Sequence, residues 1–261
     1  MRLPIYQVDA FAEKAFEGNP AAICPLSEWL PGEVMQAIAE ENNLSETAFF
    51  VPTEHGFRIR WFTPVAEVDL CGHATLASAH VIFNYLGFKE NIINFQSKSG
   101  LLTVGQNEGL LVMDFPSQPP EACCIPDEIR NAFQYSPIEC LKSEDYIVVF
   151  GSEDEVTSAQ PNLVELSKLD LRGVVITAKS NKYDFVARFF APKYGVNEDP
   201  VTGSAYTQLI PYWSNTLGAT KLHAKQISSR GGEVFCKLVG NRVSIAGKAR
   251  TYLVGAIEIQ T

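Results

Sequence analysis

The alternation of apolar and polar positions predicts the elements of the first half of the chain. Residues 57–63 alternate apolar and polar side chains and end before a proline, which is typical of a strand with one exposed face. Residues 74–86 are apolar almost all the way round, and a helix without a polar face must be buried on every side. Gly87 suits the position after the last turn of that helix. The pattern therefore predicts a strand followed by a buried helix.

The same order of elements recurs in the second half. After the first helix, residues 101–104 and 110–113 predict a hairpin, because two apolar runs flank a short polar segment that contains glycine. Residues 204–217 predict a second helix, and residues 234–238 and 242–245 predict the hairpin after it. One buried helix among many short strands in each half favours an α+β fold in which a sheet curls around a helix.

Short motifs confirm that the chain contains an internal repeat. Four segments match in order at offsets of 128 to 132 residues: 60–64 with 188–192, 72–75 with 203–206, 86–87 with 217–218, and 97–100 with 229–232. A period of half the chain excludes a solenoid of short units. The proline-rich segment 116–120 is the natural linker. We predict two pseudo-symmetric domains, residues 1–117 and 118–261, with a cleft between them and with the last strand able to return to the first domain.

Composition narrows the class of protein and its partners. The 261 residues are 46% hydrophobic and 20% charged, which excludes intrinsic disorder, and the net charge of −9 argues against nucleic acid as a partner. No apolar run could cross a membrane and no secretory signal begins the chain, so we expect a cytoplasmic protein with no membrane partner. Six cysteines without a CxxC pair predict no disulfide framework and no metal site. No nucleotide or cofactor motif occurs, so we expect no cofactor.

The starts of the two predicted helices are candidate binding sites for an anion. Gly72 and His73 open the first helix, and Gly203 and Ser204 open the second. The first backbone N–H groups of a helix lack a partner within it, and glycine lets a ligand approach the backbone closely. The alternative, which local sequence favours slightly, is that both motifs only cap their helices.

Glu46 is the main candidate for acid–base chemistry. It stands at a corner between a predicted helix that begins near Pro31 and a predicted apolar strand that begins at Thr47. Burial raises the pKa of a glutamate, which suits a general acid or base near neutral pH. An exposed corner glutamate without a function is an equally good interpretation of the local sequence.

Three further side chains lie next to the predicted helix starts. His73 could shuttle protons, although a lone histidine beside a buried helix is more often structural. Asp199 either caps the second helix or faces the cleft. Cys71 is the only thiol at a helix start, where its pKa would be lowered. The position symmetric to Cys71 is read as Pro200, so no second thiol is expected.

A set of short motifs resembles the PhzF family of phenazine-biosynthesis-like isomerases, which have a diaminopimelate-epimerase-like fold. The resemblance spans nearly the whole chain, and its motifs occur in the family's order. They are Val8-Asp9-Ala10-Phe11, Gly18-Asn19-Pro20-Ala21-Ala22, Leu44-Ser45-Glu46-Thr47-Ala48-Phe49, Phe62-Thr63-Pro64, Leu70-Cys71-Gly72-His73-Ala74-Thr75, Arg188-Phe189-Phe190-Ala191-Pro192, Glu198-Asp199-Pro200-Val201-Thr202-Gly203-Ser204-Ala205 and Ser229-Arg230-Gly231-Gly232.

The resemblance implies a function and a role for each candidate residue. It implies two barrel-like sheets, each around a central helix, and cofactor-free isomerisation of a small carboxylated substrate in the cleft between them. Glu46 matches the family's proton-transferring glutamate, and His73 and Asp199 match its supporting acid–base groups. The residues matched to substrate contacts are Ser45, Gly72, Gly203 and Ser204. The resemblance also implies a homodimer.

Two rival functions remain open from the sequence. The related epimerases and racemases use one cysteine from each half, and this chain has only Cys71, so a mechanism with one carboxylate base fits better. An amino-acid epimerase or racemase that pairs Cys71 with another group is the first rival. A small-molecule-binding protein that has lost its activity is the second. The sequence does not identify the substrate.

Overall fold

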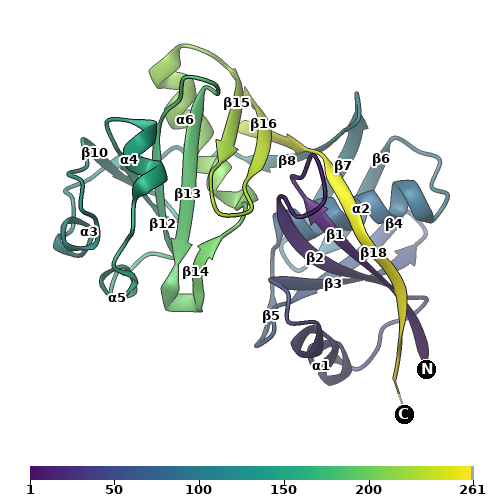
Figure 1. The fold of residues 1–261 in the computed structure, drawn as a ribbon. Helices are drawn as coiled ribbons and strands as arrows, with labels where there is room; N and C mark the ends of the chain where they lie inside the picture. The colour runs from purple at the N-terminus through teal and green to yellow at the C-terminus, as the bar shows by residue number, and fades with distance from the viewer. Residues whose placement is uncertain (260–261) are drawn as a thin grey trace. The chain divides into compact units, whose positions relative to one another are not determined.

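The computed structural model describes residues 1–259, and contacts between Cα atoms divide the chain into two compact units (Figure 1). Unit 1 comprises residues 1–114 and 246–261, and unit 2 comprises residues 115–245. The boundary predicted after residue 117 lies three residues from the division after Asp114. The last strand groups with unit 1, so the chain leaves this unit once and later returns to it.

Unit 1 contains a mixed sheet and two helices. Its strands are β1 (Arg2–Ala10), β2 (Asn19–Pro25), β3 (Glu46–Thr53), β4 (Gly56–Phe62), β5 (Glu67–Val68), β6 (Ile92–Ser97), β7 (Gly100–Asn107), β8 (Leu110–Pro116, which runs into unit 2) and β18 (Ala249–Glu258). Its helices are α1 (Gly32–Asn42) and α2 (Gly72–Tyr85).

The pairing of the strands gives unit 1 a sheet that curls around one helix. The strand order is β18-β1-β2-β3-β4-β6-β7-β8, with β5 at the end of β4. The pairs β2–β3 and β4–β6 are parallel and the other pairs are antiparallel. Helix α2 contacts β18, β1, β2 and β3 as well as β7, near the other end of this order. A sheet whose two ends reach the same helix must be strongly curved.

Helix α2 is the core of unit 1, as its apolar sequence predicts. Nine of its residues are buried, from His73 to Ile82. Each fully buried leucine or isoleucine contributes about 1.5–3 kcal/mol through the hydrophobic effect. Gly87 has φ 68° directly after the C-cap residue Leu86, which confirms the predicted left-handed end. Only the last turn departs from the expectation, because Asn84 and Tyr85 are exposed.

Unit 2 contains the second sheet and a larger number of short helices. Its strands are β9 (Glu121–Ala122), β10 (Glu139–Lys142), β11 (Tyr146–Val149), β12 (Val174–Lys179), β13 (Phe185–Ala191), β14 (Val196–Asp199), β15 (Lys221–Gln226), β16 (Gly232–Val239) and β17 (Arg242–Gly247, which runs into unit 1). Its helices are α3 (Asp127–Ala132), α4 (Glu153–Ser158), α5 (Leu163–Leu166) and α6 (Tyr206–Leu217), with 3-10 turns η1 (Pro192–Tyr194) and η2 (Gly203–Ala205).

The strands of unit 2 pair in the order of unit 1. The chain β9-β10-β11-β12-β13-β15-β16 repeats β18-β1-β2-β3-β4-β6-β7, and β14 pairs with one end of β13 as β5 does with β4. The parallel pairs β11–β12 and β13–β15 match β2–β3 and β4–β6. The repeat seen in the sequence is therefore a repeat of topology.

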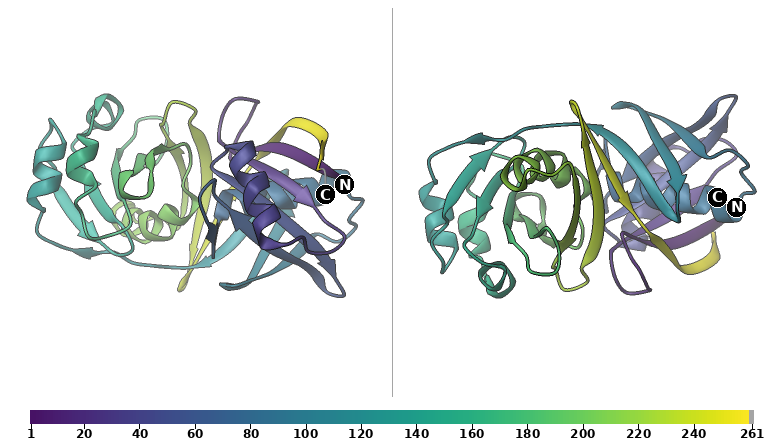
Figure 2. Two further views of the ribbon diagram at one scale, coloured as in Figure 1. Left: turned by 90° about the horizontal axis from the view of Figure 1, so that it is seen from below. Right: turned by 90° about the horizontal axis from the view of Figure 1, so that it is seen from above.

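Helix α6 is the central helix of unit 2. Figure 2 shows it nearly end-on, among the strands of this unit. The indole of Trp213 stacks on Phe185 from β13, with ring centroids 5.3 Å apart and planes 8° apart. Tyr206, Leu209 and Ile210 are also fully buried. Gly218 ends the helix with φ 66°, the counterpart of Gly87. Two α+β halves, each with a sheet around a helix, confirm the predicted fold class.

Two further findings concern the cysteines and the helices. All six cysteines are free, and the closest pair, Cys123 and Cys140, has its sulfur atoms 3.7 Å apart, too far for a bond of about 2.05 Å. Among residues 1–259 no helix combines the length and the apolar composition that crossing a membrane requires.

Candidate active site

Glu46 lies where the sequence places it, between a helix and a strand. Helix α1 ends at Asn42, the C-cap Asn43 adopts the left-handed conformation with φ 49°, and Glu46 is the first residue of β3. Ser45 precedes it in the bend before the strand and is half-buried. The Glu46 side chain is 19% exposed, so it is partly buried and still reachable from solvent.

The fold brings His73 against this carboxylate. His73 is the second residue of α2 and is buried, with Nε2 3.1 Å from Oε2 of Glu46. The two atoms are close enough for an ion pair but are not aligned as a hydrogen bond, and in residues 1–259 neither atom has another hydrogen-bond partner. A buried carboxylate oxygen and an imidazole nitrogen without better partners can exchange or share a proton.

Cys71 contacts the opposite edge of the same ring. Its Sγ lies 3.5 Å from Nδ1 of His73, so the imidazole stands between a thiol and a carboxylate. Burial raises the pKa of the Cys71 thiol, and the charge of Glu46 raises it further. The prediction that the helix start lowers this pKa is therefore wrong, because loss of solvent outweighs the helix dipole at a fully buried sulfur.

The ionisation of His73 follows from its two neighbours. Burial by itself lowers the pKa of an imidazole, but the acidic groups of Cys71 and Glu46 outweigh burial and raise the pKa of His73 well above its usual value. His73 thus lies between two acidic groups that favour its protonated form, the thiol of Cys71 at Nδ1 and the carboxyl group of Glu46 at Nε2.

The same three side chains form a group that could donate to a metal ion. Glu46, Cys71 and His73 each offer one donor atom within 4.8 Å of the others, the only such group of three among residues 1–259. Thiolate, imidazole and carboxylate are zinc ligands. A metal would have to displace the protons of both Cys71 and His73, which disfavours binding at neutral pH. The expectation of a site without metal stays a prediction.

The start of α2 offers backbone donors beside this group. Cys71 is the N-cap residue, in an extended conformation, and its side chain makes no capping hydrogen bond to the helix backbone. Gly72 and His73 therefore begin the helix without a side-chain cap, and the first N–H groups of a helix have no partner within it. This observation disfavours the interpretation of the motif as a simple cap, and Glu46, His73, Ser45 and Gly72 form one group in unit 1.

The predicted residues of unit 2 also lie together. Gly203 and Ser204 form η2, which leads directly into α6, and the N-cap Thr202 makes no side-chain cap. The Thr202 hydroxyl instead donates to Oδ2 of Asp199 at 2.5 Å. Asp199, at the end of β14, is thus oriented by Thr202. The prediction that the residues of unit 1 and unit 2 act on one substrate stays a prediction.

The structure corrects one assignment made from the sequence. The helix starts align Cys71 with Thr202, because each residue is the N-cap directly before the repeated glycine, and Pro200 lies two residues earlier. The counterpart of Cys71 therefore carries a hydroxyl. This change leaves the expectation of a single thiol intact, since threonine cannot act as a thiol base.

Sequence reasoning missed an ion pair that holds Ser204. Arg172 donates from Nη1 to Oγ of Ser204 at 3.0 Å and forms two hydrogen bonds to Asp145, which is completely buried. Arg172 and Asp145 are far apart in the chain and belong to no motif. No signal in the sequence links either residue to Ser204.

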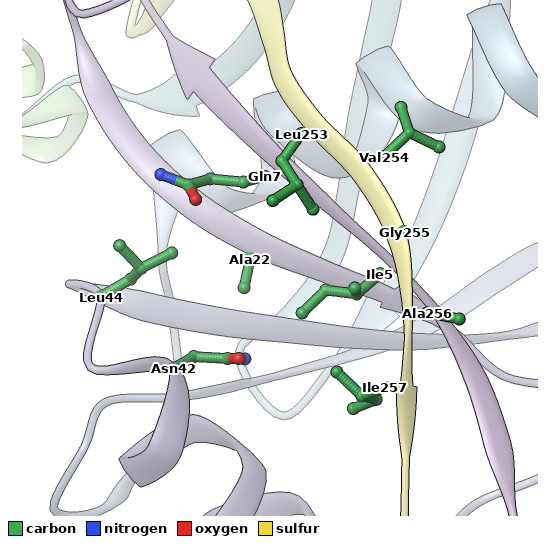
Figure 3. A pocket seen from close by; sticks show the side chains of 10 residues that line it. All are labelled: Ile5, Gln7, Ala22, Asn42, Leu44, Leu253, Val254, Gly255, Ala256 and Ile257. Carbon is green, nitrogen blue, oxygen red and sulfur yellow. The ribbon is translucent and has the colours of Figure 1, made fainter.

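A surface pocket of unit 1 lies apart from these residues. Its volume is about 360 Å³, and Figure 3 shows its lining side chains from β1, β2, the segment after α1 and β18. Ile5 and Ala22 point into it and belong to the apolar cluster that packs against α1. Because side chains alternate along a strand, these residues lie on the face of the sheet opposite α2. The pocket therefore excludes Glu46 and His73.

Comparison with known proteins identifies the family. The sequence profile of the phenazine biosynthesis-like proteins, PhzC-PhzF, matches residues 8–255. An uncharacterised isomerase of Pseudomonas aeruginosa is 50% identical over 259 residues, covering 99% of this chain and 100% of the relative. The crystal structure of a PhzF-family protein from Enterococcus faecalis superposes with a TM-score of 0.97 at 46% identity and covers 99% of this chain and 100% of that one.

A more distant structure extends the likeness to the epimerase fold. A hydroxyproline epimerase from Agrobacterium vitis shares the fold with a TM-score of 0.62 at 9% identity, covering 98% of this chain and 92% of that one. The residue motifs, the repeated topology and the profile over nearly the whole length agree with one another. The chain belongs to the PhzF family of phenazine biosynthesis-like proteins, whose relatives include proteins named as isomerases.

Proposed function

We propose that this protein is a cofactor-independent isomerase in which Glu46 removes and returns a proton on a small carboxylate-bearing substrate. The observation that carries the proposal is the 3.1 Å approach of His73 Nε2 to Glu46 Oε2, where neither buried atom has an aligned hydrogen-bond partner. A partly exposed carboxylate can reach a substrate, and the imidazolium beside it can stabilise the charged form. General acid–base catalysis of this kind contributes about 10²–10⁴-fold to a rate.

The proposed reaction conserves atoms and charge. Glu46 as carboxylate takes a proton from a carbon next to a carbonyl or an unsaturated bond, and the electron pair of the C–H bond delocalises into that group. Glu46, now a carboxylic acid, returns the proton to another carbon of the same system. His73 stabilises the carboxylate before and after the transfer. Asp199 is proposed as a supporting acid–base group.

Backbone and hydroxyl donors are proposed to hold the substrate carboxylate. Helix starts suit an anion because their N–H groups are unpaired and the helix dipole is positive there. The proposed donors are Ser45 and Gly72 in unit 1 and Gly203 and Ser204 in unit 2. Fixing the carboxylate would orient the acidic C–H bond toward a single base.

Deuterium exchange tests the role of Glu46 directly. Proton NMR in D₂O with a panel of small carboxylates, including cyclohexadiene acids and amino acids, should show one carbon that gains deuterium with the wild-type protein. Glu46→Gln should slow that exchange by about 10²-fold or more, because the amide cannot accept the proton. Glu41→Gln, an exposed glutamate on α1, is the matched control and should exchange normally. Full turnover by Glu46→Gln would show the proposal to be wrong.

A second candidate function rests on the thiol beside His73. An epimerase or racemase would use Cys71 as a base, and its Sγ does contact an imidazole nitrogen at 3.5 Å. The raised pKa of the buried thiol disfavours this function, since the thiolate is the active base. Exchange at the α-carbon of an amino acid that survives Glu46→Gln and disappears in Cys71→Ala would favour it.

The chain is also proposed to form a homodimer. Tyr252, Leu253 and Val254 of β18 are exposed apolar side chains, and Leu253 and Val254 also line the pocket of Figure 3. Exposed apolar patches of this kind often mark protein–protein interfaces. Light scattering on the purified protein should give the mass of two chains, and Leu253→Asp should give one. A wild-type mass of one chain would contradict the dimer.

A further inference from the structure

A buried ion pair in unit 2 determines how Ser204 can hydrogen-bond. Arg172 lies between α5 and β12, and its Nε and Nη2 donate to the two oxygens of Asp145 at 2.9 and 2.6 Å. Asp145, in the turn between β10 and β11, has no exposed surface. Two parallel hydrogen bonds of this kind fix the plane of the guanidinium as well as its position.

Gln208 locks the other partner of the pair. Its side-chain amide is fully buried on α6, donates to Oδ2 of Asp145 at 2.7 Å and accepts from the Asp145 backbone N–H at 3.0 Å. Asp145 is therefore tied to the central helix of unit 2, and Ser204 lies in the 3-10 turn that leads into this helix. The ion pair and the serine are parts of one rigid network.

The Arg172 guanidinium also packs against an aromatic ring, and the backbone next to Arg172 is closely packed. Its central carbon lies 5.5 Å from the ring centroid of Phe189. Gly173 follows Arg172, and a Cβ on it would come within 2.6 Å of the Phe189 ring and 2.8 Å of the Phe190 carbonyl oxygen. Only glycine lets this segment pack so closely. Arg172 is thus fixed from both the side chain and the backbone.

A further donor of Arg172, Nη1, determines the orientation of the Ser204 hydroxyl. Nη1 donates to Oγ of Ser204 at 3.0 Å, and arginine has donors only. The serine oxygen must therefore accept from Arg172, which directs the hydroxyl proton elsewhere. In the part of the chain that the structure describes, no acceptor takes this proton, and Ser204 is only half-buried. The hydroxyl is available as a donor to a ligand.

The charge of Arg172 is already compensated. Besides Asp145, its Nη1 lies 3.1 Å from Glu144, and Asp199 adds to the acidic groups that raise the pKa of Arg172. The guanidinium therefore offers the site little free positive charge. Arg172 instead contributes to anion binding by fixing the direction of the Ser204 O–H group, which lies next to the backbone of Gly203.

We propose that Arg172, locked by Asp145 and Gln208, is a positioning residue that directs the Ser204 O–H group toward the ligand and so selects a carboxylate over the isosteric carboxamide. The inference rests on the proposed binding of a substrate carboxylate at Ser204, but not on the chemistry of Glu46. A carboxylate offers one acceptor oxygen to the Ser204 O–H group and a second to the backbone N–H groups at Gly203, whereas a carboxamide has a single acceptor oxygen and its N–H₂ group can accept from neither donor.

Binding of benzoate and benzamide tests the proposal without turnover. Each is titrated into the protein while the amide NMR signals of Gly203 and Ser204 are followed. Benzoate should shift both signals saturably and bind about tenfold more tightly than benzamide, the effect expected for one hydrogen bond to a charged group. Ser204→Ala should abolish this preference. Equal binding of the two probes by the wild type, or no saturable shift with benzoate, overturns the proposal.

A double-mutant cycle separates positioning from a structural effect. Arg172→Lys keeps a cation against the buried Asp145, so the carboxylate is not left unpaired, but lysine cannot bind Asp145 bidentately and also fix Ser204. It should weaken benzoate binding by about five- to tenfold, and the Arg172→Lys/Ser204→Ala variant should bind no more weakly than Ser204→Ala alone. If the two single-variant losses of benzoate affinity multiply in the double variant, the proposal is overturned. Unchanged benzoate binding by Arg172→Lys also overturns it.

A control variant at a second arginine and the deuterium-exchange assay distinguish the possible outcomes. Arg188→Lys alters another bidentate ion pair of unit 2, with Glu198, and should leave the benzoate preference unchanged. Thermal unfolding verifies that each variant is folded. If deuterium exchange survives Glu46→Gln while this cycle shows coupling, the proposed chemistry is wrong and the positioning role stands. If exchange is lost in Glu46→Gln while the cycle shows no coupling, only the positioning role of Arg172 is rejected.

Discussion

Units 1 and 2 begin their central helices with the same backbone motif and different chemistry. In unit 1 the residues around Gly72 are a thiol and an imidazole, and the imidazole faces the carboxylate of Glu46. In unit 2 the residues around Gly203 are the hydroxyls of Thr202 and Ser204. Carboxylates and imidazoles can take up a proton as general bases, whereas hydroxyls stay protonated at neutral pH. Under the proposed function, both helix starts would bind an anion, and proton transfer would belong to unit 1.

Two equivalent arginines of the repeat also differ from each other in their surroundings. Arg60 and Arg188 occupy the same place in the repeat, each pairs bidentately with a glutamate, and each lies 5.1 Å over a phenylalanine two residues further on. Arg188 also donates to the carbonyls of Val156 and Ala159 at the end of α4. Within residues 1–259, Arg60 donates no hydrogen bond to a backbone carbonyl, and its partner Glu67 has Lys98 as a second cation.

The largest effect is therefore expected from loss of Arg188. Arg188→Met leaves Glu198 and two carbonyl groups without their donor, which should lower the free energy of unfolding by about 3 kcal/mol. Arg60→Met leaves Glu67 paired with Lys98, so its cost should be about 1 kcal/mol. Urea unfolding of both variants measures the difference. Equal costs would show that the bonds to α4 contribute nothing.

Local patterns in the sequence predicted the elements around these pairs well. The apolar run of α2 and the glycine after it depend only on neighbouring residues, so both were predictable. The first hairpin was found, but its strands extend to Asn107 and from Leu110, with Glu108 and Gly109 in the turn at φ 49° and 78°. Its polar residues concealed the strand ends, because hairpin tips are exposed on both faces.

The side-chain clusters were less predictable because they join distant segments. Glu46 and His73 were assigned through the resemblance to a family, and no spacing rule places them 3.1 Å apart. The link from Ser204 through Arg172 to Asp145 joins three loops and elements that no motif connects. The shift of the Cys71 pKa was predicted with the wrong sign, since the burial that raises this pKa depends on the folded chain and not on the neighbouring residues in the sequence.

A smaller effect is expected for Glu67 in acid. Hydrogen bonds from Arg60, against the opposing effect of burial, lower the pKa of Glu67 to about 2, with Lys98 assisting. A carboxyl group with a lowered pKa stabilises the fold above its ordinary pKa of 4.5, and this contribution is lost as the pH falls toward 2. The stability advantage of the wild type over Glu67→Gln should therefore shrink between about pH 5 and about pH 3. An advantage independent of pH would contradict the lowered pKa.

His73 should produce the opposite pH dependence. Because its pKa in the folded state is raised above 6.5, its contribution is complete below that pH and is lost as the pH rises through the folded-state value. The stability advantage of the wild type over His73→Gln should decrease as the pH rises above 6.5. His80, whose pKa is lowered to about 4 by burial, stays neutral in this range, so His80→Gln is a control with a constant effect. A constant advantage over His73→Gln would show that no imidazolium forms.

The smallest effect is expected from Cys71, and it tests which side of the His73 ring carries the chemistry. The thiol is 6% exposed, its pKa is raised by burial, and it contacts Nδ1 while Glu46 faces Nε2. A neutral group behind the ring can orient the imidazole but cannot serve as the base. Cys71→Ser should therefore retain deuterium exchange to within about fivefold, far from the loss expected for Glu46→Gln. An equal loss in both variants would move proton transfer to the thiol, and unit 1 would then resemble the thiol-dependent epimerases in chemistry as well as in fold.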